Sequence, residues 1–195
     1  MAESQAVPLA SIFDGWSGYQ TSLVHAIEPL TPEQLAFTPF EGQRTVGEIA
    51  RHISLGRLNW FMRMNAPLSA DLCARIQDWT EDRDGNRYIV DESIAITGQA
   101  AELVAWLRST WEMVEATLSQ WTVADLALTY KHTYWGTTYE VPRQWTIWRI
   151  MAHDIHHGGQ LTIMLGMQGI EAMELIGLGG HIVEPPKADT TQPAD

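Results

Sequence analysis

The chain has 195 residues, 45% of them hydrophobic, and its 24 acidic against 12 basic residues give a formal net charge of −12. A chain of this length and composition can bury one sizeable core, so we expect a single domain over residues 1–183 and a disordered tail over 184–195, where proline and polar residues gather. The acidic surface would repel nucleic acids and anionic membranes, and we expect neither as a partner.

The first part of the chain has helical periodicity. Apolar residues recur at helical spacing over residues 9–30, which predicts a first long helix. Residues 31–34 combine a capping threonine, a proline at the first helical position and an early carboxylate, so they predict a short helix. A second long helix is predicted over residues 45–64, because Thr45 and Glu48 form a capping box in front of an apolar face.

The second part of the chain alternates between polar and helical segments. Residues 66–92 are polar and rich in aspartate, which favours a solvated loop. A third long helix is predicted over residues 97–120. Residues 126–141 alternate with residues that favour strands, so we expect a short β-hairpin there. A fourth long helix is predicted from Pro142 to about residue 169.

The fourth predicted helix carries two histidines one turn apart. His153 and His157 share one face, and this spacing lets two imidazoles bind one metal ion. Apolar residues flank them on both sides, which indicates a buried strip, and buried imidazoles need hydrogen bonds or a metal. His52, at the edge of the apolar face of the second long helix, is the best candidate for a third ligand. The alternative is that all three are hydrogen-bonded core residues.

The capped segment T-V-G-E-I-A-R-H followed by N-W-F, and the last helix with W-x-x-W-x-x-x-x-H-D-I-H-H-G-G-Q, resemble the DinB/YfiT-like superfamily of four-helix-bundle metalloenzymes. The resemblance covers roughly residues 12–169. It implies an all-α fold, a four-helix bundle of up-down-down-up type with a short β-hairpin before the last helix. It also implies that the family's three metal-binding histidines correspond to His52, His153 and His157. Characterised members transfer low-molecular-weight thiols, and others are regarded as hydrolases.

Three imidazoles constrain the chemistry of such a site. Neutral nitrogen ligands suit zinc, nickel or iron better than calcium or magnesium, and three protein ligands leave a position open for water or substrate. A divalent metal lowers the pKa of bound water or of a thiol, which gives a nucleophile at neutral pH. Together with this chemistry, the resemblance implies a metal-dependent thiol S-transferase or hydrolase that attacks a small electrophilic substrate, with a low-molecular-weight thiol as cofactor in the first case.

The catalytic base is harder to identify from the sequence. Glu48, one turn before His52, is the first candidate, and Asp154, beside His153, is the second. The simpler interpretation of Glu48 is its role in the helix cap.

A non-catalytic function is the alternative hypothesis. In this hypothesis the protein is a dimeric metal-binding or stress-response scaffold. The fourth helix has a second face of small or apolar residues that could pack on another copy of the chain, so we expect a homodimer. That face consists of Met151, Ile155, Gly158 and Thr162.

Other histidines and tryptophans have weaker patterns. We interpret His132 as a surface residue of the hairpin, and His156 as a neighbour of the ligands rather than a ligand. Trp60, Trp145 and Trp148 could line a pocket near the metal, but the composition favours the core.

The remaining sequence features concern the compartment. The chain has a single cysteine, Cys73, so it has no intrachain disulfide framework. The N-terminus resembles no signal peptide and no apolar run reaches membrane-spanning length, so we expect a cytoplasmic protein.

Overall fold

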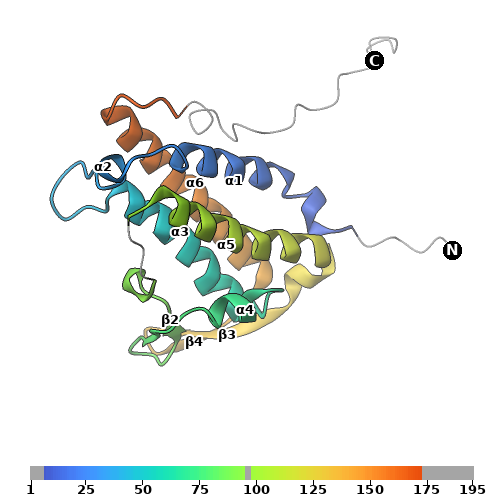
Figure 1. Cartoon of the computed structure of the whole chain (residues 1–195). Coiled ribbons are helices and arrows are strands. Elements are labelled where there is room, and N and C mark those ends of the chain that lie inside the picture. The colour runs from blue at the N-terminus through green and yellow to red at the C-terminus, as the bar shows by residue number, and fades with distance from the viewer. Residues whose placement is uncertain (1–6, 95–97, 173–195) are drawn as a thin grey trace, which may run out of the picture.

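A computed structural model provides the structure of the protein and describes residues 7–94 and 98–172. Within these residues the chain is mostly helical, with six α-helices and two antiparallel sheets of two strands each (Figure 1). Helix α3 packs against α5 and α6, and α1 packs against the same two helices. The four long helices are α1 (Asp14–Ile27), α3 (Val46–Phe61), α5 (Ala100–Gln120) and α6 (Arg143–Met167). Their up-down-down-up order stays a prediction, and the expected tail at 184–195 lies outside the described residues.

The predicted first helix is wrong in its N-terminal part. A 3-10 turn, η1 (Leu9–Ser11), precedes α1, and the two are separate elements. The backbone N–H of Leu9 donates to the carbonyl of Trp121 at 3.0 Å, and the Leu9 side chain is fully buried. This contact fixes the turn at the end of α5, so the apolar spacing continues although the helix does not. The short helix α2 (Pro32–Leu35) begins after Thr31, as predicted.

Helix α3 begins where its capping box predicts. Thr45 Oγ1 accepts from the backbone N–H of Glu48 at 3.2 Å, and Glu48 Oε2 accepts from the backbone N–H of Thr45 at 2.7 Å. These two bonds satisfy N–H groups that the helix itself leaves without partners. The helix continues into the 3-10 turn η2 (Met62–Met64), so the predicted range of 45–64 is confirmed.

The segment predicted as a solvated loop has structure of its own. It contains a short helix α4 (Ser69–Cys73), the paired strands β1 (Thr80–Glu81) and β2 (Arg87–Tyr88), and the 3-10 turn η3 (Asp91–Ser93). Asp82 Oδ1 accepts from the backbone N–H groups of Asp84 and Asn86, both at 2.9 Å. These bonds close the turn that joins β1 and β2. An aspartate whose presence suggested an irregular loop thus stabilises a defined turn.

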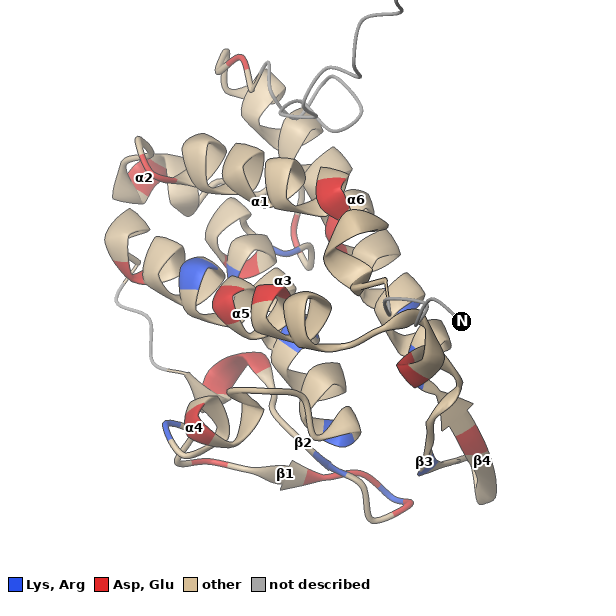
Figure 2. Cartoon of the chain, turned by 90° about the vertical axis from the view of Figure 1, so that its right-hand side faces the viewer, with Lys and Arg blue, Asp and Glu red and all other residues tan. Residues whose placement is uncertain are grey.

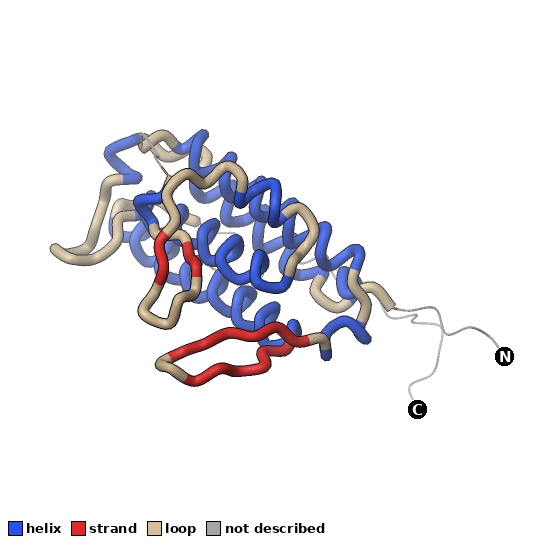
Figure 3. Tube along the Cα trace, turned by 90° about the horizontal axis from the view of Figure 1, so that it is seen from below, coloured by secondary structure: helices blue, strands red, loops and turns tan. Residues whose placement is uncertain are grey.

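The predicted hairpin is confirmed as β3 (Thr129–Tyr134) and β4 (Thr137–Pro142), and α6 follows directly. The two residues between the strands, Trp135 and Gly136, both have positive φ, as in the two-residue turns that match the twist of a hairpin. The Asp84 carboxylate accepts from both of their backbone N–H groups, at 2.7 and 2.9 Å. This bond pair joins the two strand pairs, which lie at the same end of the helices (Figures 1 and 3).

The charge of the chain is spread over its surface. Figure 2 shows acidic residues on several helices and loops rather than on one face. Among the residues described, no helix is both long enough and apolar enough to cross a membrane.

Candidate metal centre

Three histidines from two helices converge between α3 and α6. His52 comes from α3, and His153 and His157 come from α6. One potential ligand atom of each residue lies within 4.8 Å of the others, so the group could hold a metal ion. The ring centroids are 4.4 Å apart for His153 and His157, and those two lie 5.0 and 4.8 Å from His52. The structure therefore brings together the three residues that the sequence singled out.

A glycine of α3 makes room for one of these rings. A Cβ atom at Gly56 would lie 2.5 Å from Cε1 of His153 and 3.0 Å from its Nε2. The absence of a side chain at Gly56 thus allows the His153 ring to pack against α3, one turn beyond His52. Gly56 lies on the apolar face predicted for this helix, but periodicity alone does not predict that it makes room for a ring. The available signal was a glycine inside a helical pattern, which usually has a packing or functional reason.

Two of the imidazoles contact an oxygen through Nδ1. His157 Nδ1 lies 2.7 Å from Gln160 Oε1, one turn along the same helix. His52 Nδ1 lies 3.5 Å from Asp91 Oδ1. When a histidine donates from Nδ1 to an oxygen, its Nε2 is left with the lone pair that a metal needs. Donation from Nδ1 to Gln160 and to Asp91 would leave Nε2 of each ring available to a metal.

The charge states of this group suit ligation. Burial, followed by the neighbouring histidines, lowers the pKa of His157 to about 4, although the hydrogen bond that Gln160 Oε1 accepts from the ring raises it, so the ring is neutral near pH 7. Burial of Asp91 raises its pKa, but the hydrogen bond and charge of His52, with the charge of Arg44, outweigh it and hold the pKa below its usual range. A neutral His157 is what a metal ligand requires, and an ionised Asp91 is suited to accept a hydrogen bond from His52.

A buried ion pair stands behind His153. Arg57 and Asp154 are both fully buried, and Arg57 Nε and Nη2 each lie 2.8 Å from Asp154 Oδ2. Trp16 Nε1 donates to the same oxygen at 2.9 Å. The other oxygen, Oδ1, lies 3.7 Å from His153 Nδ1, and neither atom has a hydrogen-bond partner among the described residues. Asp154 is thus held with one oxygen toward His153.

Glu48 has the contacts of a helix cap. Its carboxylate accepts from Thr45, and Glu48 lines a cavity of about 280 Å³ together with Leu35 and Arg51, whereas no histidine of the triad lines it. The catalytic role expected for Glu48 stays a prediction, and these contacts favour the structural interpretation.

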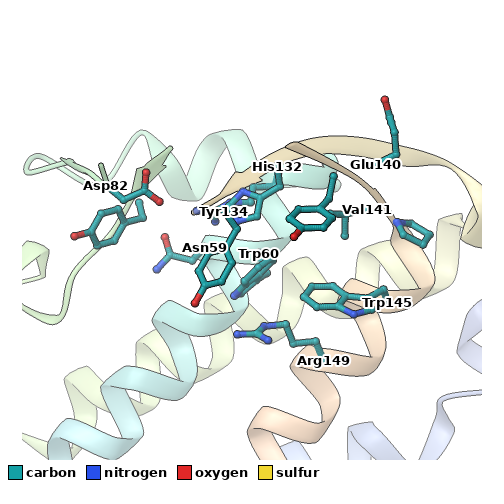
Figure 4. A pocket seen from close by; sticks show the side chains of 13 residues that line it. Asn59, Trp60, Asp82, His132, Tyr134, Glu140, Val141, Trp145 and Arg149 are labelled. Carbon is teal, nitrogen blue, oxygen red and sulfur yellow. The ribbon is translucent and has the colours of Figure 1, made fainter. Parts of the chain in front are cut away.

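A larger cavity, of about 710 Å³, is lined by residues of α3, α6 and the β3–β4 hairpin (Figure 4). Trp60 and Trp145 line it and pack edge to face, with ring centroids 5.5 Å apart. His132 packs on Trp60 at 5.4 Å and also lines the cavity, so its interpretation as a surface residue is wrong. Trp145 and Trp148 are 44% and 63% exposed, so the core interpretation is wrong for both. The hairpin brings His132 there, and helical spacing could not show this.

The outer face of α6 also differs from the prediction. Gly158 is buried, because Tyr19 packs directly over it. His156 is exposed, with its ring centroid 5.0 Å from that of His157. Large apolar side chains do form an exposed stripe on this helix, at Trp148, Ile155, Ile163 and Met167.

Comparisons with known proteins agree with this fold. The model of the DinB superfamily matches residues 18–161. The chain is similar to a crystal structure of a DinB-like protein from Bacillus cereus ATCC 10987, with 19% sequence identity and a TM-score of 0.60, over 86% of this chain and 97% of that one. At this identity the likeness concerns the fold alone. A comparison with curated proteins gave no match.

Proposed function

Since the chain belongs to the DinB superfamily, we propose that it is a metal-dependent enzyme whose metal is held by His52, His153 and His157. The observation that carries the proposal is the convergence of three imidazoles from α3 and α6. The substrate is a small electrophile, and the nucleophile is a low-molecular-weight thiol or water. These two nucleophiles correspond to a thiol S-transferase and a hydrolase.

The residues present fit a divalent transition metal. The ligand atoms of the triad lie within 4.8 Å of one another, so the three side chains could hold one ion between them. Zinc, nickel or iron suits three neutral imidazoles. Such an ion lowers the pKa of a water or thiol that it binds.

The protein's own groups hold the triad in place. Gln160 and Asp91 orient the rings of His157 and His52, and the Asp154 carboxylate can accept the Nδ1 proton of His153 once that ring rotates slightly. The fixed orientation of a ligand raises metal affinity, because fewer conformations are lost on binding.

Metal content tests the proposal first. Purification without chelator should give about one equivalent of metal per chain by elemental analysis, and alanine variants of His52, His153 and His157 should each lose it. His156→Ala is the matched control, because His156 is exposed on the same helix beside His157. Metal retained by all three variants would refute the site.

Cobalt substitution tests the open coordination position. Azide or a small thiol should change the visible spectrum of the cobalt protein, and a subsequent screen should compare thiol conjugation with hydrolysis. A spectrum that responds to neither would refute an enzyme that binds its nucleophile at the metal.

The role of Glu48 has its own test. Glu48→Gln keeps a side chain that can accept from Thr45, because glutamine serves equally in a capping box, but it removes the base. Unchanged turnover in Glu48→Gln would assign Glu48 to the cap alone, whereas a loss of turnover at unchanged stability would assign it the base.

A dimeric scaffold is the second candidate, and the exposed apolar stripe on α6 is the observation that favours it. Single surface apolar residues are ordinary, but four large ones along one helix favour association with a second copy. Ile155→Glu together with Ile163→Glu should convert a dimer to a monomer in sedimentation experiments. A dimer whose cobalt spectrum is unresponsive would favour the scaffold over the enzyme.

A further inference from the structure

The large cavity continues the seam that carries the triad. Arg149 precedes His153 by one helical turn on α6, and Trp60 follows Gly56 by one turn on α3. One turn advances about 5.4 Å along a helix, so the cavity begins one turn from the histidines. Its volume of about 710 Å³ lies in the range of small-molecule sites.

Arg149 has no anionic partner in the described part of the chain. Its guanidinium carbon lies 4.7 Å from the ring centroid of Trp60 and 5.2 Å from that of Trp145, and its charge also acts on Tyr130 and His132. Figure 4 shows Arg149 reaching from α6 toward Trp60 at the edge of the cavity. The two indoles hold the guanidinium in place, while its N–H donors are left for a ligand.

A second guanidinium adds positive charge to the same wall. The Arg63 guanidinium carbon lies 5.1 Å from the Trp60 centroid, and Nη2 donates to the carbonyl of Arg87 at 3.2 Å. Its Nη1 is buried and has no hydrogen-bond partner among the residues described. A buried cationic donor without an acceptor is costly, so an anion that reached Arg63 would satisfy its Nη1, while the exposed Arg149 side chain is accessible to an anion that enters the cavity.

The acidic residues of the cavity are engaged elsewhere. Asp82 accepts from the backbone of Asp84 and from both the backbone and side chain of Asn86. Glu140 accepts from Thr129 Oγ1 at 2.9 Å, and Figure 4 shows its carboxylate directed away from the cavity. Asp82 stays ionised and its charge acts on Arg63, so Arg149 is the cation of the cavity that forms no ion pair among the described residues.

We propose that this cavity binds a planar aromatic carboxylate and that this is the substrate class of the metal centre. The aromatic part would pack against Trp60 and Trp145, and the carboxylate would pair with Arg149. A cationic ligand fits less well, because the guanidinium groups of Arg63 and Arg149 would repel it. The inference rests on the proposed function insofar as the ligand is a substrate. Arg149 lies between the aromatic walls and the triad along α6, so the carboxylate end of the ligand would face the histidines.

The experiment measures binding to the metal-free full-length protein, so that a carboxylate cannot bind through a metal. Isothermal titration calorimetry compares 2-naphthoate with 2-naphthamide, which has nearly the same shape and no charge. We expect 2-naphthoate to bind at least about tenfold more tightly, as one charge-assisted hydrogen bond requires. Arg149→Gln should remove this preference, and Arg149→Lys should restore part of it, because lysine keeps the charge but not the planar fork.

Arg83→Gln is the matched control. Arg83 stacks on Trp135 with its guanidinium carbon 3.6 Å from the ring centroid, yet it does not line the cavity. Its affinity for 2-naphthoate should equal that of the wild type. Three results would each overturn the inference: equal affinity for the two naphthalenes, an unchanged affinity in Arg149→Gln, or binding of a naphthyl trimethylammonium ion in place of the carboxylate.

A failure of the proposed function would give a different experimental result from a failure of this inference. Loss of the metal site would appear in the elemental analysis and the cobalt spectrum while 2-naphthoate binding persisted. A sound metal site without selective 2-naphthoate binding would reject the substrate class alone.

Discussion

The replacement of Gly56 by alanine should weaken metal binding without weakening the fold. The new Cβ would lie 2.5 Å from Cε1 of His153, whereas ordinary contacts begin near 3.4 Å, so the ring must retreat by about 1 Å. Metal–nitrogen distances tolerate only about 0.2 Å. A change that acts through the position of one ligand is expected to cost about 10- to 100-fold in metal affinity. Alanine inside a helix meanwhile gains roughly 1 kcal/mol over glycine.

Competition with a chromophoric zinc chelator measures the affinity, and urea unfolding of the metal-free protein measures the stability. Gly159→Ala is the control, because a Cβ at Gly159 meets no atom within 4 Å and the site is equally inside a helix. It should gain a similar helical stability and keep full metal affinity. Zinc affinity in Gly56→Ala within twofold of the wild type would refute the reasoning, since His153 would then not depend on the space at Gly56.

Three further outcomes are expected. Asp154→Asn should lower the free energy of unfolding in urea by about 3–5 kcal/mol, because it leaves Arg57 buried without a charge partner. Glu28→Gln, at an exposed ion pair, should lower it by less than about 1 kcal/mol. Equal decreases would contradict the importance of the buried pair. Burial, then the charge of Asp154, raises the pKa of Tyr19 from 10.0 to about 12, so its contribution of at most about 3 kcal/mol is full below pH 10 and is lost as the pH rises through 12. Thermal unfolding of the wild type and Tyr19→Phe checks this, and an equal alkaline loss in both would count against it. Chelator should lower the melting temperature of the wild type but not that of His157→Ala, and an equal decrease in both would point to another metal site.

The helices that carry the triad could be predicted from local signals. The capping box of Thr45 and Glu48 fixes the start of α3, and the four-residue spacing of His153 and His157 places both on one face of α6. His52 could be added because a polar residue at the edge of an apolar face stands out. Local periodicity is sufficient for such features, since they depend on neighbours within a turn or two.

The supporting contacts could not be predicted, because they depend on how the helices cross. Arg57 is a charged residue, and charged residues are seldom fully buried unless paired, so only the position of Asp154 on the neighbouring helix explains it. Asp91 reaches His52 from a segment whose composition indicated solvent. His132 lies on a hairpin. The alternating residue pattern predicts the two strands, but it does not predict against which helices the hairpin packs.

The Asp84 carboxylate, which accepts two hydrogen bonds at the tip of the β3–β4 hairpin, suggests how ligand specificity could diverge among relatives. The three histidines belong to α3 and α6, and so do Trp60, Trp145 and Arg149, while the hairpin and the turn after β1 cover the rest of the adjoining cavity. Part of the cavity wall can therefore change without any change at the triad. Exchange of residues 129–142 among family members should therefore change the ligand specificity of the cavity, while the affinity for metal is preserved. Substitutions in the hairpin could in this way change which ligands fit the cavity.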